Sequence, residues 1–291
     1  MNVIEIEGLK KTFPKSSFTL DLPRLTVREG YVTGFIGENG AGKTTTLKLM
    51  MDMLFPDEGR VSIFGKDAHR DGVEIRRRIS YIGENTGFLE QAKLSTLKAM
   101  VQPFYPDWDE AAFGRYVERF SLDLGKRYNA LSKGQRKQFA LAVALSHHPR
   151  LLLLDEPTAN LDPLVRQDIL DILAEEMQQE GVSVFFSTHI TSDLDKIADY
   201  LLFLHRGRLL LEGEKDAILD SRRRVKARRE LYTPEAARLL VSAEVGEFGF
   251  TGLTEEFPAL FALLGNEALY EKPTVEDLFL AYTRRDREDA R

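Results

Sequence analysis

Residues 131–162 read LSKGQRKQFALAVALSHHPRLLLLDEPTANLD, and three kinds of local structure follow one another in this stretch. A small-residue turn, Leu131–Gln135, precedes a helical pattern, and the apolar run Leu151–Leu154 then ends in two carboxylates, Asp155 and Glu156. A short, continuous apolar run is typical of a buried parallel strand, and ligands of open α/β sheets bind at the carboxyl ends of such strands. The stretch therefore predicts an α/β fold with a ligand site beside the two carboxylates.

A second motif lies upstream, where the apolar run 31–36 leads into residues 37–44, GENGAGKT. These residues fit the pattern G-x-x-x-x-G-K-[ST] between a strand and a helix, which we expect over residues 45–54. The glycines let backbone N–H groups point into one anion-binding concavity, the lysine reaches the β- and γ-phosphates, and the threonine hydroxyl is placed for Mg²⁺. We expect a nucleotide to be bound by Gly37, Glu38, Asn39, Gly40, Ala41, Gly42, Lys43, Thr44 and Thr45.

The two carboxylates that follow the apolar strand have different expected roles. Adjacent strand residues point in opposite directions, so Asp155 and Glu156 can both act on one ligand only if the strand ends there. Asp155 is the expected Mg²⁺ ligand together with Thr44, and Glu156 is the expected group that polarises the attacking water. The alternative is a solvated acidic turn before Pro157, which the phosphate loop upstream disfavours.

The composition restricts the class of protein. The chain has 291 residues, with 43% hydrophobic and 30% charged residues, as in a soluble globular protein. Its longest apolar runs are far shorter than the roughly 20 residues of a membrane-spanning helix, and Glu5 and Glu7 leave no room for a signal-peptide core. The absence of cysteine excludes disulfides and is compatible with a cytosolic location, and the net charge of −6 argues against general nucleic-acid binding. A role at a membrane would therefore need another protein as the anchor.

Hydrophobic periodicity predicts the order of the elements. Alternating or continuous apolar runs indicate strands at residues 3–6, 18–22, 25–27, 60–64, 79–82, 151–154 and 182–187. The first three predict an antiparallel β region, with Pro23 as a break between two strands. Residues 89–131 have an amphipathic helical pattern and are expected to form a helical subdomain inserted into the sheet-bearing core. A crossover helix is expected over residues 163–179.

The residue composition changes after Asp220, so we expect a large domain over residues 1–219 and a small accessory domain over residues 220–291. Within the accessory domain, the strongly basic run 222–229 is expected to be a solvated strand or helix face, with a lipid or RNA site as the alternative. Residues 275–283 are expected to form a helix.

The turn that opens the quoted stretch offers a second anion site. Ser132 and Gly134 place a hydroxyl and free N–H groups at a helix N-terminus, which suggests that two chains share each ATP. In combination, the motifs over residues 3–213 resemble the ATP-binding subunits of ABC transporters. The resemblance implies an α/β P-loop NTPase core with a mostly parallel sheet. It also implies a head-to-tail dimer, in which the ATP of one subunit is closed over by Ser132, Lys133, Gly134, Gln135 and Asp162 of the other.

The resemblance implies roles for single residues as well. His189 matches the histidine that contacts the γ-phosphate, although a lone histidine after a strand is otherwise more often structural. Phe13 lies where the family has an aromatic residue that stacks on adenine, and the alternative is an ordinary core residue. Glu84 stands where the family usually has Gln; it can hold Mg²⁺ but adds negative charge beside the phosphates. The implied catalytic residues are Glu156, His189, Lys43 and Glu84.

A narrower resemblance concerns the subfamily. Residues 104–109, FYPDWD, and Lys133 in place of the usual glycine are similar to bacterial ABC-2-type export ATPases. This implies hydrolysis of ATP with Mg²⁺ by a dimer with a second copy or a paralogue. The dimer would drive a separate integral membrane permease, docked by residues 84–123, at the inner face of the cell membrane. The alternative is a soluble ABC ATPase that acts on ribosomes or nucleic acid, but the chain has one cassette and no coiled-coil heptads.

Overall fold

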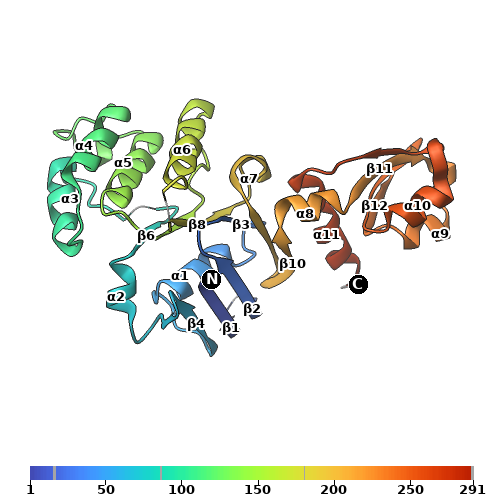
Figure 1. Cartoon of the computed structure of the whole chain (residues 1–291), viewed down its shortest axis with the longest axis horizontal. Helices are drawn as coiled ribbons and strands as arrows, with labels where there is room; N and C mark the ends of the chain where they lie inside the picture. The colour runs from blue at the N-terminus through green and yellow to red at the C-terminus, as the bar shows by residue number, and fades with distance from the viewer. Residues whose placement is uncertain (16–17, 86, 180, 290–291) are drawn as a thin grey trace.

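The computed structural model describes residues 1–15, 18–85, 87–179 and 181–289, and these residues form three β-sheets surrounded by helices (Figure 1). An antiparallel N-terminal sheet and a mostly parallel central sheet lie together at one end of the molecule, with the helices of the first two hundred residues around them. A third sheet lies at the other end with the last helices of the chain. The predicted α/β fold class is confirmed.

The N-terminal sheet has the strand order β2-β1-β4-β5. Its strands are β1 (Asn2–Phe13), β2 (Phe18–Arg28), β4 (Glu58–Ile63) and β5 (Lys66–Asp67). The predicted break at Pro23 is wrong, because β2 continues through it in register, with Leu22 opposite Leu9 and Arg24 opposite Glu7. Since β2 is an edge strand, a proline without an N–H group need not interrupt the ladder.

The central sheet has the order β10-β9-β3-β8-β7-β6, in which β10 alone runs antiparallel to its neighbour. Its strands are β3 (Val32–Gly37), β6 (Ile79–Ile82), β7 (Leu151–Asp155), β8 (Ser183–Thr188), β9 (Tyr200–His205) and β10 (Arg208–Glu214). Every residue of β3, β7 and β8 is buried, as the continuous apolar runs predict. Because these three strands are parallel neighbours, their carboxyl ends meet at one edge of the sheet.

Helices cover both faces of this sheet. They are α1 (Lys43–Met50), α2 (Gly72–Arg76), α3 (Leu94–Val101), α4 (Glu110–Arg119), α5 (Lys133–Leu145), α6 (Pro163–Glu176) and α7 (Thr191–Ile197), with short 3₁₀ turns at Gln102–Phe104 and Tyr128–Ala130. Helix α1 begins two residues earlier than predicted and ends at Met50, before the left-handed Asp52 (φ 56°). Helices α3 and α4 occupy the predicted helical region and lie beside α5 (Figure 1).

Alternate residues of the central strands face two separate apolar cores. Leu152 and Leu154 of β7 pack in a core with the helical region and α6, whereas Leu151 and Leu153 pack in a core with α1 and the N-terminal sheet. This alternation follows from the two-residue period of a strand. The sheet edge that carries Asp155 is therefore fixed from both sides.

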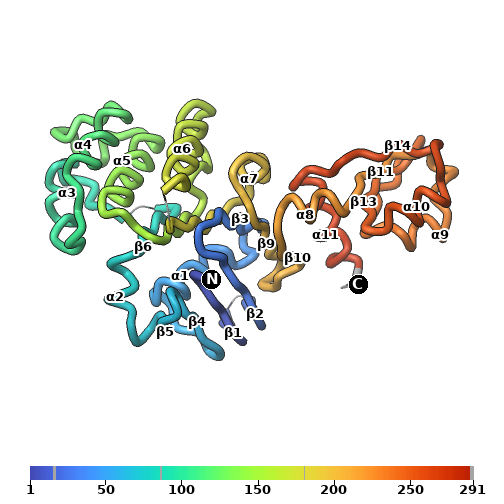
Figure 2. The backbone as a smooth tube through the Cα atoms, viewed as in Figure 1, coloured from blue at the N-terminus to red at the C-terminus, as the bar shows by residue number. Residues whose placement is uncertain are grey.

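The third sheet has the order β12-β13-β11-β14. Its elements, after α8 (Lys215–Asp220), are β11 (Arg223–Arg228), α9 (Pro234–Arg238), β12 (Ser242–Val245), β13 (Gly249–Thr254), α10 (Phe257–Leu264), β14 (Leu269–Glu271) and α11 (Val275–Asp289), with 3₁₀ turns at Arg229–Leu231 and Gly265–Glu267. Helix α11 extends further than the predicted 275–283. It returns from this sheet toward β10 (Figure 2), and Phe279 packs edge-on against Phe203 of β9.

The basic run 222–229 forms strand β11 in the interior of this sheet. Its side chains pair within the chain: Arg224 Nε lies 3.4 Å from Asp277 and Lys226 Nζ lies 2.8 Å from Glu271. These pairs neutralise part of the positive charge of the run.

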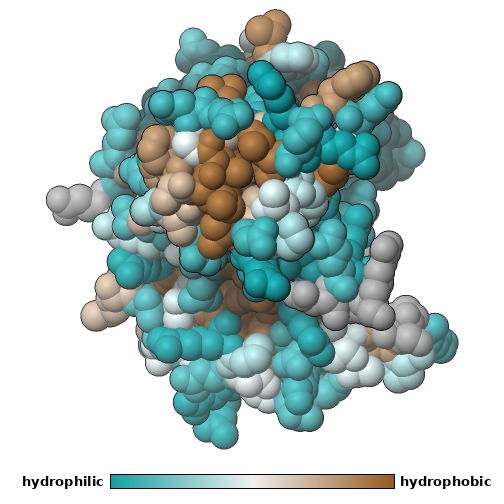
Figure 3. Space-filling view, turned by 90° about the vertical axis from the view of Figure 1, so that its right-hand side faces the viewer, coloured by the Kyte–Doolittle hydropathy of each residue, from teal (hydrophilic) through white to brown (hydrophobic). Residues whose placement is uncertain are grey.

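The surface at this end of the molecule carries apolar side chains gathered among polar ones (Figure 3). Helix α10 contains no charged residue and exposes Phe261 and Leu263 to solvent. Even so, no helix within the described residues has both the length and the apolar character needed to cross a membrane.

A candidate nucleotide-binding site

The phosphate loop connects β3 to α1 at the carboxyl edge of the central sheet. Gly40 and Gly42 have φ angles of +83° and +113°, which side-chain-bearing residues rarely adopt. The N–H group of Ala41 donates to the carbonyl of Glu38 (3.1 Å), so the loop folds back on itself before the helix begins. The loop thus has the geometry of an anion nest at a helix N-terminus.

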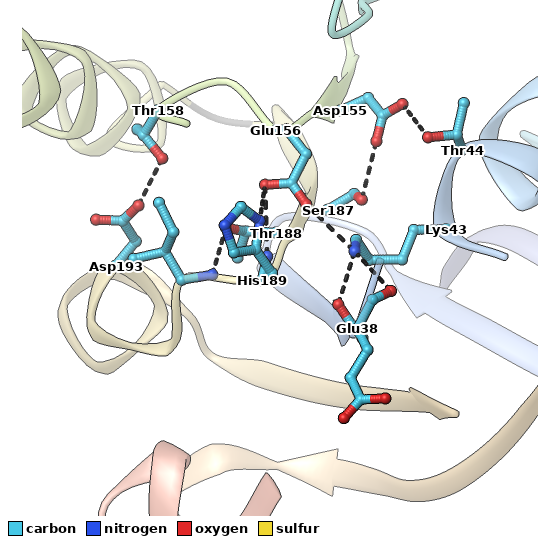
Figure 4. A network of polar contacts seen from close by, with 12 residues as sticks. Glu38, Lys43, Thr44, Asp155, Glu156, Thr158, Ser187, Thr188, His189 and Asp193 are labelled. Atoms are coloured by element: carbon cyan, nitrogen blue, oxygen red, sulfur yellow. Dashed lines mark hydrogen bonds and ion pairs between the residues drawn. The ribbon is translucent and has the colours of Figure 1, made fainter. Parts of the chain in front are cut away.

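The buried ammonium group of Lys43 lies at the centre of this loop. Its Nζ donates to the carbonyl oxygens of Gly37 (2.6 Å) and Glu38 (3.3 Å) and lies 3.2 Å from Glu156 Oε1. Figure 4 shows Lys43 and His189 on two sides of the Glu156 carboxylate. An ammonium group beside a loop of N–H donors is suited to bind the negatively charged phosphates of a nucleotide.

Asp155 ends strand β7 and lies beside the start of α1. Its Oδ2 accepts a hydrogen bond from Thr44 Oγ1 (2.7 Å) and its Oδ1 accepts one from Ser187 Oγ (3.1 Å). Burial raises the pKa of Asp155, while these two hydrogen bonds oppose that effect. Two of the three predicted Mg²⁺ ligands, Thr44 and Asp155, are therefore neighbours.

These residues fit Mg²⁺ when a nucleotide supplies further oxygen atoms. Magnesium is usually bound through one or two carboxylates together with substrate phosphates. Within the described residues there is no group of three or more His, Cys, Asp or Glu side chains that could hold a metal alone. Thr44 and Asp155 would thus be the protein ligands. Glu84, the third predicted ligand, lines one cleft together with Thr44.

Glu156 turns away from the strand that precedes it. Its φ of 50° is left-handed, a strained conformation for a residue with a side chain, and its N–H group donates to the Ser187 carbonyl (2.9 Å). Its Oε2 lies 2.9 Å from His189 Nδ1, whereas the buried Oε1 has no aligned hydrogen-bond donor in the described part of the chain. The strand ends where the sequence predicts, and the strained turn aims the second carboxylate toward the phosphate loop.

A buried aspartate that sequence reasoning missed braces this edge. Asp193 in α7 accepts hydrogen bonds from Thr158 Oγ1 (2.6 Å) and Arg166 Nε (2.6 Å), so it joins the turn after β7 to the segment after β8. Both segments carry site residues, Glu156 and His189. An acidic residue in the first turn of a helix is too common for the sequence to have singled it out.

Most of the residues predicted to act within one chain line a single cleft of about 730 Å³, whereas Gly37, Ala41 and Asp155 are not among its lining residues. Phe13 lies at its rim, half-buried and 6.3 Å from the ring of Phe18, which also lines the cleft and was not predicted. The lining comprises Phe13, Phe18, Glu38, Asn39, Gly40, Gly42, Lys43, Thr44, Thr45, Glu84, Glu156, Ala159, Asn160 and His189.

The residues expected to act on a partner's nucleotide lie outside this cleft. Ser132 caps α5: its Oγ accepts from the N–H of Gln135 (3.2 Å), and Gln135 Oε1 accepts from the N–H of Ser132 (3.1 Å). Asp162 caps α6 by accepting from the N–H groups of its first turn. Lys133 lines a neighbouring cavity of about 410 Å³, and Gly134 packs against Val165.

Comparison with known proteins identifies the family. Residues 20–159 match the model of the ABC transporter family. The bacitracin transport ATP-binding protein BcrA of Bacillus licheniformis is 30% identical over 212 residues, which cover 72% of this chain and 69% of BcrA. This chain belongs to the ABC transporter ATP-binding proteins. It is an ATPase of the ABC type, and the resemblance found in its motifs is confirmed.

Two further relatives extend the comparison. The uncharacterized ABC transporter ATP-binding protein YhcH of Bacillus subtilis is 30% identical over 304 residues, covering 99% of this chain and 98% of YhcH. A solved ATP-binding subunit of an ABC transporter is 28% identical, with a TM-score of 0.68 over 75% of this chain and 92% of that chain. The similarity to YhcH includes the third sheet and α11.

Proposed function

We propose that this ABC ATPase binds ATP with Mg²⁺, dimerises around two nucleotides and drives export through a separate membrane permease. The observation that carries this proposal is that the phosphate loop, Glu156 and His189 line one cleft, behind which the buried Asp155 accepts a hydrogen bond from Thr44 of the loop. Two of these residues, Glu156 and His189, contact each other, and Glu156 also reaches Lys43.

Each residue of the cleft has a role that follows from its contacts. Lys43 and the loop N–H groups bind the phosphates, and Thr44 and Asp155 would hold Mg²⁺, whose positive charge would offset the negative charge of the phosphate oxygens as ADP leaves. Glu156 orients the attacking water through Oε1, which lies 3.2 Å from Lys43 Nζ and has no aligned hydrogen-bond donor among the described residues. His189, held by Glu156 Oε2, contacts the γ-phosphate, and Phe13 stacks on the adenine.

The position of the turn at residues 132–135, here called the signature turn, supports the dimer. Ser132, Lys133, Gly134 and Gln135 open helix α5 outside the chain's own cleft, and an exposed helix N-terminus attracts anions. A second subunit, in head-to-tail orientation, brings its turn and its Asp162 over this nucleotide. Loss of the γ-phosphate on hydrolysis then weakens the closed state.

The transport partner lies outside this chain. The helical region around residues 84–123 docks the permease, which keeps the ATPase at the inner face of the membrane. Residues 1–219 form the ATPase domain, with residues 89–131 as its helical insertion, and residues 220–291 form an accessory domain. No nucleic-acid partner is expected at a net charge of −6.

Replacement of the proposed water-orienting residue tests the catalytic assignment. Glu156→Gln removes the carboxylate charge at nearly constant volume, so steady-state ATP hydrolysis should fall by roughly 100-fold or more while ATP still binds. Glu90→Gln, at an exposed glutamate paired with Arg136, is the matched control and should hydrolyse ATP normally. Normal turnover by Glu156→Gln would show that another group positions the water.

Affinity purification of the tagged chain from its native membranes tests the transport role. We expect a stoichiometric protein with several membrane-spanning segments to co-purify. Recovery of ribosomes or DNA without a membrane protein would contradict the transport role, although the ATPase assignment would stand.

A further inference from the structure

Helix α5 carries a lysine, Lys137, that is only 9% exposed. Its Nζ donates a hydrogen bond to the carbonyl oxygen of Gly83 (2.8 Å), the residue before Glu84. Burial of an ammonium group is unfavourable unless nearby charge and hydrogen bonds compensate it. One backbone carbonyl uses one of the three N–H donors of this group, so the surroundings of Lys137 must supply the rest of the compensation.

Three carboxylates supply negative charge around this lysine. Burial lowers the pKa of Lys137, and the charges of Asp155, Glu84 and Glu156 act in the opposite direction, toward the charged form. Two of them, Glu84 and Glu156, line the nucleotide cleft, and Asp155 bonds Thr44 of the phosphate loop. Lys137 is thus a second cation near the phosphate site, and it comes from helix α5 rather than from the phosphate loop.

The cavities place Lys137 next to the nucleotide. It lines the cavity of about 410 Å³ that also holds Lys133, and Glu84 and Glu156 line both this cavity and the nucleotide cleft. The lysine therefore connects helix α5, whose N-cap is Ser132, to the loop that carries Glu84. Neither the motif pattern nor the family match gives this residue a role.

We propose that Lys137 is a positioning residue that holds the Glu84 loop and offsets the charge of Glu84 beside the phosphates. This inference rests on the proposed function of the cleft. A carboxylate at position 84 increases the repulsion between the protein and a triphosphate, because Asp155 and Glu156 already contribute two negative charges. The buried ammonium group of Lys137, on helix α5, reduces that repulsion without occupying the space of the nucleotide.

Three substitutions of Lys137 separate the holding of the Glu84 loop from the offsetting of the Glu84 charge. Lys137→Arg keeps the charge and the donors, Lys137→Gln keeps a donor without charge, and Lys137→Met removes both. Each is measured for ATPase kcat and KM, and for affinity toward a fluorescent ATP analogue, in the wild-type and the Glu84→Gln background. We expect Lys137→Met and Lys137→Gln to lower kcat by about tenfold, with analogue affinity within about threefold, and Lys137→Arg to keep about half of the activity.

The Glu84→Gln background is the decisive comparison. Once position 84 is neutral, loss of the Lys137 charge should cost less, so Glu84→Gln should recover most of the kcat lost in Lys137→Gln. An equal loss in both backgrounds would overturn the charge-offsetting role. Full activity of Lys137→Gln and Lys137→Met would overturn the positioning role as a whole.

Gln138 provides a matched control, since it is the next residue of α5 and is also 9% exposed. Gln138→Met should keep kcat within about twofold of wild type; a tenfold loss there would mean that any change in α5 damages the site. If Lys137→Met does not fold, the kcat values of Lys137→Gln and Lys137→Arg still test the proposed role of Lys137. A folded wild type that binds no ATP would contradict the proposed function itself, whereas failure confined to these variants contradicts only the role of Lys137.

Discussion

His147 illustrates, at the scale of single residues, how a buried polar group makes stability depend on pH. Ser80 Oγ donates to the Ala144 carbonyl (2.6 Å) and lies 2.7 Å from His147 Nε2, so it accepts the Nε2 proton. Among the residues that the structure describes, the opposite nitrogen, Nδ1, is buried with no hydrogen-bond partner, and Tyr105 stacks on the ring at 3.8 Å. Burial lowers the pKa of His147 to about 4.

The free energy of unfolding should therefore fall on acidification. Between pH 6.5 and about pH 4 the unfolded chain binds a proton at residue 147 and the folded chain does not. The contribution of neutral His147 to the free energy of unfolding is therefore fully present above pH 6.5 and is lost progressively as the pH falls toward 4. The full effect is at most ~3 kcal/mol. Urea unfolding at pH 7 and pH 5 measures it, and His147→Gln should have a smaller difference between the two pH values. An unchanged difference would assign the acid sensitivity to other groups.

Residues whose roles depend on local spacing were predictable from the sequence, and residues that act over long distances were not. Lys43, Asp155 and Glu156 follow strands at the carboxyl edge of the sheet, and this order alone brings them together. Lys137 contacts a carbonyl 54 residues away, and only the fold decides that contact. The long-range partner of a charged residue has no signal in one sequence.

At the scale of elements, helix α5 begins with a capping box that also places the signature turn. Ser132 and Gln135 exchange side-chain and backbone hydrogen bonds, which satisfies two N–H groups at the helix start. Strand and helix types followed from periodicity, but the break at Pro23 was wrongly predicted. The position of β2 at the edge of its sheet makes that proline acceptable, and edge position is a property of the fold.

Removal of the Ser132 hydroxyl should have two separable effects. Ser132→Ala removes the N-cap, which lowers the free energy of unfolding by about 1 kcal/mol, and it also removes a proposed contact with the partner's ATP. Thr233→Ala removes the equivalent cap of α9, where Thr233 Oγ1 accepts from the Ala236 N–H group. Both variants should lose similar stability, and Ser132→Ala alone should lose ATP hydrolysis. Equal hydrolysis by the two variants would limit Ser132 to a capping role.

At the scale of the whole molecule, the last helix joins the third sheet to the phosphate loop. Arg287 Nη2 in α11 lies 2.6 Å from Glu38 Oε1, and the buried His205 lies between Glu38 (3.7 Å) and Asp286 (3.5 Å). The sequence predicted a helix in this region and an accessory domain. Its return to the nucleotide site could not be predicted, because an arginine near the C-terminus has no distinguishing pattern.

The ion pair between Arg287 and Glu38 should steady the phosphate loop only modestly, since both side chains are about half exposed. Such pairs contribute up to ~1 kcal/mol and are weakened by salt. We expect Arg287→Ala to raise the KM for ATP by about twofold to fivefold at about 0.05 M NaCl. The difference should be smaller at about 0.5 M NaCl, where the Debye length is roughly one-third as long.

Arg284 is the matched control for this prediction. It lies one turn earlier on the same helix, and its Nη2 pairs with Glu244 of β12 at 3.0 Å. Arg284→Ala should leave the KM for ATP unchanged. Equal changes in both variants would attribute the effect to the helix as a whole, not to its contact with the phosphate loop.

The most direct measurement of the central claim is the mass of the Glu156→Gln variant in solution, by light scattering, with ATP·Mg²⁺ and with ADP·Mg²⁺. Because this variant should bind ATP without hydrolysing it, the head-to-tail arrangement predicts a dimer with ATP and a monomer with ADP. A monomer that holds bound ATP across the measured protein concentrations would contradict a site shared by two chains.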